Sequence, residues 1–196
     1  LSELQPEQAH LFGNKAINLG FMVLHNIPVP PALCISIDIY KQYLKQTGLR
    51  ERILLELNRK EFTDMRWEEI WDTALRIRNM FLNTPLPDTL ATTLTDRFSE
   101  LFTDTRVVVR SSAPGEDAAG KSFAGLHDSY VNVSGIDRII EHMKLVWASL
   151  WSDRALLYRQ ELNLSLDSSA MAVVVQQLID SDQSGIAFSQ NPVNAS

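Results

Sequence analysis

Residues 106–133 constrain the fold most, because two strand-like patterns lie on either side of a glycine-containing loop. The first pattern is RVVVR at 106–110, a β-branched run typical of a strand. The second is SYVNV at 129–133, in which apolar and polar residues alternate. Between them, GEDAAGKSF at 115–123 fits G-x-x-x-x-G-K-[ST], the phosphate loop of many nucleotide hydrolases. The stretch therefore predicts either a P-loop or a glycine-rich β-hairpin.

The residues after the loop favour the hairpin. A P-loop needs a helix that begins at its Lys-Ser pair, here Lys121 and Ser122, so that helix amides meet the phosphates. Instead Gly125 follows early, and strand-like alternation starts at Ser129. We interpret the stretch as strand, loop and strand, a hairpin whose amides could lie over phosphates as a lid. A plain surface hairpin with turn glycines is the alternative.

The chain divides into a mostly helical part, 1–105, and a strand–hairpin–helix–strand part, 106–196. Together they predict a mixed α/β (α+β) fold. In the first part we expect a helix capped by Asn14, a short strand at 32–36 that holds the single cysteine as a small buried hydrophobe, and a helix from Ser36 to Gly48. Further helices with core-facing stripes follow over 50–105, and these stripes include Trp67, Ile70, Trp71, Ala74, Leu75, Phe81, Leu82, Leu90, Leu94, Phe98, Leu101 and Phe102.

The second part predicts an amphipathic helix at 136–151, a helix that restarts at Ser152, and a buried strand at 170–179. The turn DSDQSG then leads into GIAFS as a second hairpin. Length and a 45% hydrophobic content fit a globular protein of about one domain. A net charge of −6 disfavours nucleic acid as a partner. The absence of a signal peptide and of a long apolar run predicts no membrane association and a cytoplasmic location.

Two cations are candidates for phosphate binding. Arg110 ends the strand that leads into the loop, and a guanidinium there can fork onto phosphate oxygens. The alternative for Arg110 is a surface salt bridge to Glu116 or Asp117. Lys15 lies at the start of the first helix, where the helix dipole disfavours a cation by about 0.3–1 kcal/mol unless an anion binds there too. The alternative for Lys15 is an ordinary solvated lysine.

Adjacent amides directly after an apolar β-branched run are unusual, and VVVQQLI has them after its three valines. Gln176 or Gln177 could hydrogen-bond the edge of an adenine ring. The alternative is that strand alternation simply exposes one of the two amides.

Taken together, these stretches resemble the N-terminal ATP-binding region of the phosphoenolpyruvate synthase and pyruvate phosphate dikinase family, which the rifampicin phosphotransferases share. The matching stretches, in the family's order, are GNKAINLG, IPVPPALCIS, VVVRSSAPGEDAAGKSFAGLHDSYVNV, VWASLWSDRALLYR and AVVVQQLIDSDQSGIAFSQNPV. The helical region 46–104 lies outside the match.

The resemblance implies an ATP-grasp fold, incomplete in this chain, with ATP under a glycine-rich hairpin. It implies phosphate contacts and a catalytic role for Lys15 and Arg110. It also implies nucleotide contacts for Gly125 and Ser129, an adenine contact for Gln176 and no special role for Lys121. The usual Gly-Gly-Lys-Gly reads Gly13-Asn14-Lys15-Ala16 in this chain.

The family's Mg²⁺ ligands and carrier histidine are expected outside this chain, so no metal ligand is assigned within it. The implied reaction uses ATP to phosphorylate the carrier histidine and then pyruvate, giving phosphoenolpyruvate. The partners expected from the resemblance are ATP, pyruvate through the parts outside this chain, and a second copy in a full-length homodimer. We expect the 196-residue chain alone to bind ATP weakly and to catalyse nothing. Transfer to an antibiotic hydroxyl and a non-catalytic nucleotide-binding module are the alternatives.

Overall fold

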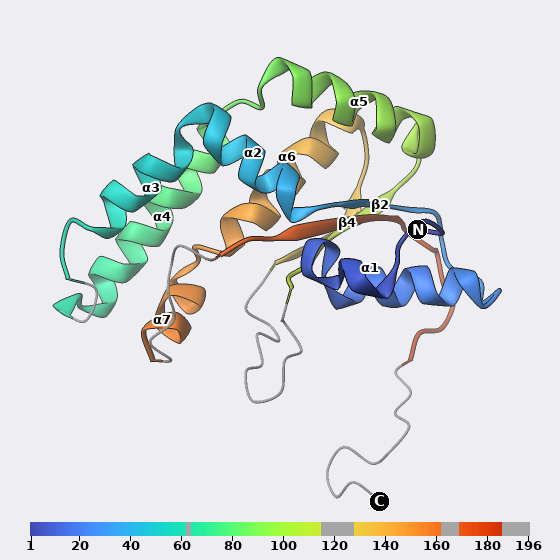
Figure 1. Cartoon of the computed structure of the whole chain (residues 1–196), viewed down its shortest axis with the longest axis horizontal. Helices are drawn as coiled ribbons and strands as arrows, with labels where there is room; N and C mark the ends of the chain where they lie inside the picture. Colours follow the sequence, from blue (N-terminus) through green and yellow to red (C-terminus); the bar gives the residue numbers. More distant parts are fainter. Residues whose placement is uncertain (62–63, 115–127, 162–168, 186–196) are drawn as a thin grey trace, which may run out of the picture.

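A four-stranded antiparallel sheet with helices on both faces forms the fold of the computed structural model (Figure 1), which describes residues 1–61, 64–114, 128–161 and 169–185. A 3-10 helix, Pro6–Gln8, precedes the other elements. In chain order these are α1 (Ala9–Leu24), β1 (Ala32–Ile35), α2 (Ile37–Thr47), α3 (Leu49–Leu57), α4 (Trp67–Asn83), α5 (Asp88–Phe102), β2 (Val107–Ser112), β3 (Ser129–Val133), α6 (Ile136–Ser149), α7 (Asp153–Glu161) and β4 (Ala172–Gln177).

The sheet is built around two valine-rich central strands, in the order β1-β4-β2-β3, and all neighbours are antiparallel. β2 pairs with β4 along its whole length, from Val107 opposite Gln177 to Ser112 opposite Ala172. The consecutive strands β2 and β3 also pair antiparallel, in agreement with the strand–loop–strand interpretation. The connecting loop at 115–127 lies outside the described residues, and so does most of the predicted GIAFS strand.

β3 contains a bulge that the alternating pattern of SYVNV did not predict. Val107 lies opposite Val133, whereas Val109 lies opposite Tyr130, so β3 has one residue more than β2 in this interval. Asn132 absorbs the extra residue in a left-handed conformation with φ 59°. Tyr130 and Val133 consequently face the same side of the sheet.

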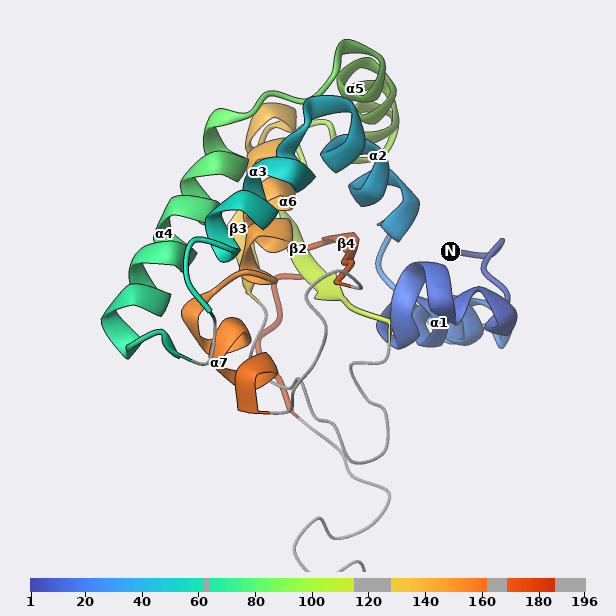
Figure 2. The same cartoon turned by 60° about the vertical axis from the view of Figure 1, so that its left-hand side comes forward.

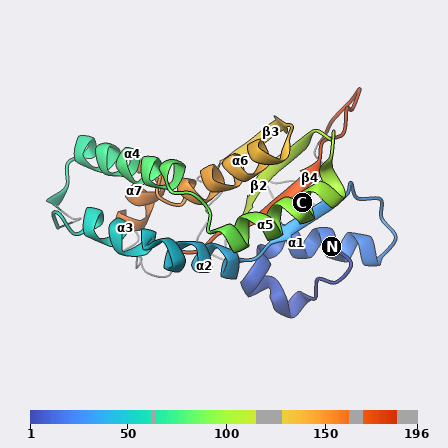
Figure 3. The same cartoon turned by 90° about the horizontal axis from the view of Figure 1, so that it is seen from above.

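The main core lies between the sheet and α6, with α2 to α5 packed beyond it (Figures 1 and 2). Seen from above, the α3–α4 pair extends away from the strands (Figure 3). A cluster of aromatic rings joins these helices, with ring centroids 5.3 to 6.3 Å apart, and it contains Tyr40, Tyr43, Phe81 and Trp147. Each of the four side chains is at most 1% exposed, so this cluster anchors the helical part to α6.

The expectation that Trp67 and Trp71 belong to the core is wrong. Their side chains are 58% and 49% exposed, and Leu101 on α5 is 44% exposed. The buried face of α4 instead contains Ile70, Thr73, Ala74, Ile77 and Phe81. A spacing of three and four residues identifies an apolar stripe, but α4 carries a stripe wider than the surface that α6 and α7 cover.

Most predicted helix ends agree with the structure. Gly48 ends α2 in a left-handed conformation with φ 65°, and the Ser152 hydroxyl accepts a hydrogen bond from Ala155 N at 3.2 Å at the start of α7. The first helix differs, because α1 starts at Ala9 and bends at Gly13, whose φ of 74° and ψ of 162° are not helical. The break therefore falls on Gly13, and the prediction of Asn14 as the cap is wrong.

The bend in α1 fits closely against the end of β2. α1 lies on the face of the sheet opposite α6 and contacts β1, β4 and β2 (Figure 1). A Cβ atom built on Gly13 would lie 2.6 Å from Ser112 Oγ, and nearer still to the Ser112 carbonyl oxygen. Only glycine combines the required positive φ with this close approach of two backbones.

Truncation in the aromatic cluster tests the described core. We expect Phe81→Ala to lower the free energy of unfolding by about 3–5 kcal/mol, because the fully buried ring is lost and the packed side chains around it can fill the cavity only in part. The exposed Leu101 is the control, and Leu101→Ala should cost under about 1 kcal/mol. Urea denaturation of both variants measures the difference, and equal losses would contradict the placement of the core.

Gly13 and Gly48 form a matched pair for testing the contact between α1 and β2. Both have positive φ, but a Cβ on Gly48 would meet nothing within 4 Å. Gly48→Ala should therefore cost only the left-handed strain, about 1–2 kcal/mol. Gly13→Ala should cost about 1–3 kcal/mol more, because the new methyl group overlaps Ser112 and because the backbone of Gly13, with φ 74° and ψ 162°, lies in a region that essentially only glycine adopts. Thermal unfolding compares the two variants, and equal costs would show that the two backbones are not in contact.

Candidate functional site

Strand alternation places Arg110 on the α1 side of the sheet. Ser112 contacts α1, and residues two apart in a strand share a face, so Arg110 shares the face of Ser112. Arg110 lies opposite Ser129 on β3 and Val174 on β4. Ser129 therefore shares this face as well, and both Arg110 and Ser129 are exposed.

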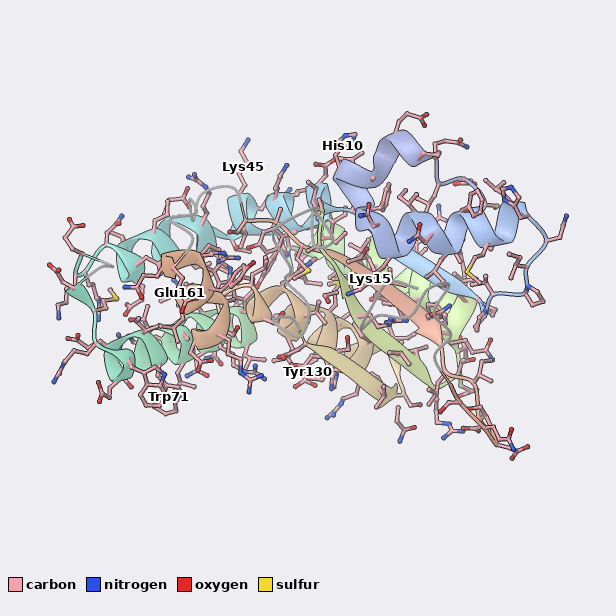
Figure 4. The ribbon with its side chains drawn as sticks, turned by 90° about the horizontal axis from the view of Figure 1, so that it is seen from below. His10, Lys15, Lys45, Trp71, Tyr130 and Glu161 are labelled. Carbon is pink, nitrogen blue, oxygen red and sulfur yellow. The ribbon has the colours of Figure 1, made fainter. Side chains whose placement is uncertain are left out.

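Lys15 lies on α1, next to the end of β2 that carries Ser112. It lies between Gly13 and Ala16, and both of these residues contact Ser112. Figure 4 looks onto this face from below and shows Lys15 beside the strands, at the edge of α1. Ser112 is two positions beyond Arg110, about 7 Å along the strand. The two predicted cations thus come from distant parts of the sequence to one end of one sheet face.

α1 covers this face unevenly. Val174 under α1 is 2% exposed, whereas Arg110, directly opposite it on the next strand, is exposed. α1 contacts β1, β4 and β2, and the polar side chains of Arg110 and Ser129 lie beyond it toward the β3 edge. Within the described ranges, α1 therefore borders a strip of exposed polar side chains.

The structure separates the two candidate amides of β4. Gln176 lies opposite Val108 and faces the α1 side, whereas Gln177 lies opposite Val107 and faces α6. The Gln176 side chain is 9% exposed, and its Nε2 donates to Pro30 O at 3.5 Å. Gln176 thus shares the face of Arg110, two positions further from Ser112 along the sheet, with its amide directed toward the segment before β1.

Arg110 differs from the arginine at the other end of the same segment. Arg106 forms an ion pair with Asp180, whereas no carboxylate of the described residues pairs with Arg110. Its suggested partners Glu116 and Asp117 lie outside the described residues, as do Gly125 and Lys121. The described residues therefore do not test the salt bridge that is the alternative for Arg110.

Cys34 also faces the α1 side, opposite Val174. Burial raises the pKa of its thiol to about 11, although the positive charge of the N-terminus acts in the other direction. The thiol stays protonated at neutral pH, so Cys34 serves as a small apolar side chain and not as a nucleophile.

Sequence reasoning missed the contact that holds α1 against β2, which is formed by Gly13 and Ser112. Ser112 is fully buried, with its hydroxyl between the two halves of α1. The twin serines after Arg110 were a visible signal, but only the register shows that Ser112 faces α1 whereas Ser111 faces α6.

Other features of the described residues lie away from this face. A cavity of about 690 Å³ borders α2, α3 and the segment before β4, and its lining includes Lys41, Lys45 and Arg50 but none of the predicted site residues. No group of three or more His, Cys, Asp or Glu side chains in the described ranges could hold a metal ion. No described helix has the length and apolar character to cross a bilayer.

Comparison with known proteins identifies the family of the chain. Residues 9–196 match the family described as pyruvate phosphate dikinase, AMP/ATP-binding domain. The chain is 37% identical to a phosphoenolpyruvate synthase of Aeropyrum pernix, with 98% of this chain and 24% of that protein covered. It is 35% identical to a rifampicin phosphotransferase of Streptomyces sviceus, with 99% and 22% covered.

A rifampicin phosphotransferase of Bacillus subtilis is 29% identical over 100% of this chain and 22% of its own length. The chain thus spans about a quarter of the length of these curated relatives. The family match covers nearly the whole chain, including both elements that carry the candidate cations. The chain therefore belongs to the pyruvate phosphate dikinase AMP/ATP-binding domain family.

Proposed function

We propose that this chain is the ATP-binding part of a phosphotransferase that phosphorylates a carrier histidine and then pyruvate, giving phosphoenolpyruvate. The observation that supports the proposal is that Ser112 lies close to both positions in the fold. Lys15 precedes Ala16, whose amide donates to Ser112 Oγ, and Arg110 lies two positions before Ser112 on the same face of β2. The family description and the names of the phosphoenolpyruvate synthase relatives support it.

The proposed task of this face is to offset the charge of the triphosphate. Arg110 would fork onto phosphate oxygens, and Lys15 would add a point charge from a second direction. Because the sheet and α1 hold both cations before the nucleotide arrives, the two side chains need little reorganisation during nucleotide binding or phosphoryl transfer. Gln176 would lie toward the adenine, and Ser129 and Gly125 would contact the nucleotide from the hairpin.

Mg²⁺ would shield the phosphates and orient the transferred group. By resemblance to the family, its ligands are proposed to lie outside this chain. The same holds for the carrier histidine and the pyruvate site. A homodimeric assembly and a cytoplasmic location complete this proposal.

A second candidate shares the ATP site but changes the acceptor. Several relatives, at 29% to 35% identity, are named rifampicin phosphotransferase. This similarity favours an antibiotic hydroxyl as the rival acceptor. A third possibility is a nucleotide-binding module without transfer activity, and it would bind ATP through the same two cations.

ATP binding by substituted chains tests the proposal. ATP should raise the thermal unfolding midpoint of the unmodified chain, whereas Arg110→Ala should weaken binding about 10- to 100-fold through loss of charge-assisted hydrogen bonds. The matched control is Arg106→Ala, on the same segment, which should keep the ATP-induced shift. A normal shift for Arg110→Ala would contradict the proposed site.

Lys121 tests the rival P-loop interpretation. Lys121→Ala should keep most of the ATP-induced shift, since the proposed site assigns it no phosphate contact. Loss of the shift in Lys121→Ala but not in Arg110→Ala would favour a P-loop.

The chain alone should form no AMP from ATP in a chromatographic assay, because the proposed carrier histidine and metal ligands lie outside it. Turnover of ATP to AMP would show that the chemistry needs no residue outside this chain.

A further inference from the structure

We infer that Ser112 is a positioning residue that fixes Lys15 relative to Arg110, and this inference depends on the proposed function. Ser112 is 0% exposed, so it cannot touch a bound nucleotide itself. Its side chain contacts the two halves of α1 on either side of the bend. Its hydroxyl can therefore affect nucleotide binding only indirectly, and the partners of that hydroxyl lie on α1.

The hydroxyl of Ser112 bridges a pair of helix groups that the bend separates. Ser112 Oγ donates to Phe12 O at 2.6 Å and accepts from Ala16 N at 3.3 Å. Ala16 is four residues after Phe12, so a continuous α-helix would join these two groups directly. The non-helical φ and ψ of Gly13 interrupt the hydrogen bond from Ala16 N to Phe12 O, and the serine hydroxyl bonds to both groups instead.

The chemistry of this position restricts which side chain can serve. The bridge needs one group that both donates and accepts, and a hydroxyl does both. The hydroxyl also lies close to the bend, because a Cβ atom built on Gly13 would lie 2.6 Å from Ser112 Oγ. Alanine at position 112 would leave a buried carbonyl and a buried amide without this partner.

The bridge from Ser112 to α1 also fixes how far Lys15 lies from Arg110, and this separation would decide whether both can bind one polyphosphate. Lys15 precedes the bridged Ala16, and Arg110 shares the face of Ser112 two positions earlier in β2. The path from one cation to the other therefore runs through one buried hydroxyl and one short piece of strand. Without the hydroxyl, the first turn after the bend can shift along the sheet and carry Lys15 away from Arg110.

A double-mutant cycle tests this coupling, with affinities for ATP and for adenosine measured by calorimetry. Ser112→Ala should weaken ATP binding about tenfold and adenosine binding less than twofold, because adenosine has no phosphates for Lys15 to contact. In a Lys15→Ala background, Ser112→Ala should weaken ATP binding less than twofold further. The matched control is Ser111→Ala, a neighbouring buried serine on the other face, which should keep the wild-type ratio of the two affinities.

Equal losses of ATP affinity in both backgrounds, or equal losses for ATP and adenosine, would show that Ser112 is merely structural. Absence of ATP binding by the unmodified chain would instead overturn the proposed function. If Ser112→Ala does not fold, Ser112→Cys, whose thiol is a weak donor and acceptor, enters the same cycle with the same criteria. Amide exchange of Ala16 supplies a ligand-free readout, and it should quicken in Ser112→Ala but not in Ser111→Ala.

Discussion

The bridge from Ser112 to the bend in α1 decides how the first helix lies on the sheet. A helix that ran straight through Gly13 would have no place for the serine hydroxyl, and a side chain at position 13 would overlap β2. The close approach of the two backbones brings residues nearly one hundred positions apart into direct hydrogen bonding. The placement of Lys15 beside the strand of Arg110 follows from this contact, as does the uneven cover of the α1 face.

The sequence predicts those parts of the fold that depend on local patterns. RVVVR and AVVVQQ form strands because β-branched runs suit a buried sheet, and SYVNV forms the more exposed edge strand. Gly48 ends a helix because it adopts positive φ. The exposed Trp67 and Trp71 show the limit of periodicity, which finds an apolar face but not its partner. The bulge at Asn132 depends on pairing with β2, which no pattern within β3 reveals.

The candidate site was predictable in its residue types and not in its arrangement. Lys15, Arg110 and Gln176 could be selected because each is unusual in its local context, and the family resemblance strengthened each selection. Their common face depends on the β2–β4 register and on the side of the sheet that α1 occupies, both of which are tertiary properties. The supporting pair of Gly13 and Ser112 has no local signature beyond a glycine and a doubled serine, so only the packed structure identifies it.

The most direct test is the structure of the chain with a non-hydrolysable ATP analogue. If the two cations share one nucleotide, Lys15 Nζ and the Arg110 guanidinium will each lie about 3 Å from oxygens of the same polyphosphate, beside the bend in α1. A polyphosphate bound elsewhere, for example among Lys41, Lys45 and Arg50 in the cavity near β4, would contradict this. So would a nucleotide in contact with only one of the two cations.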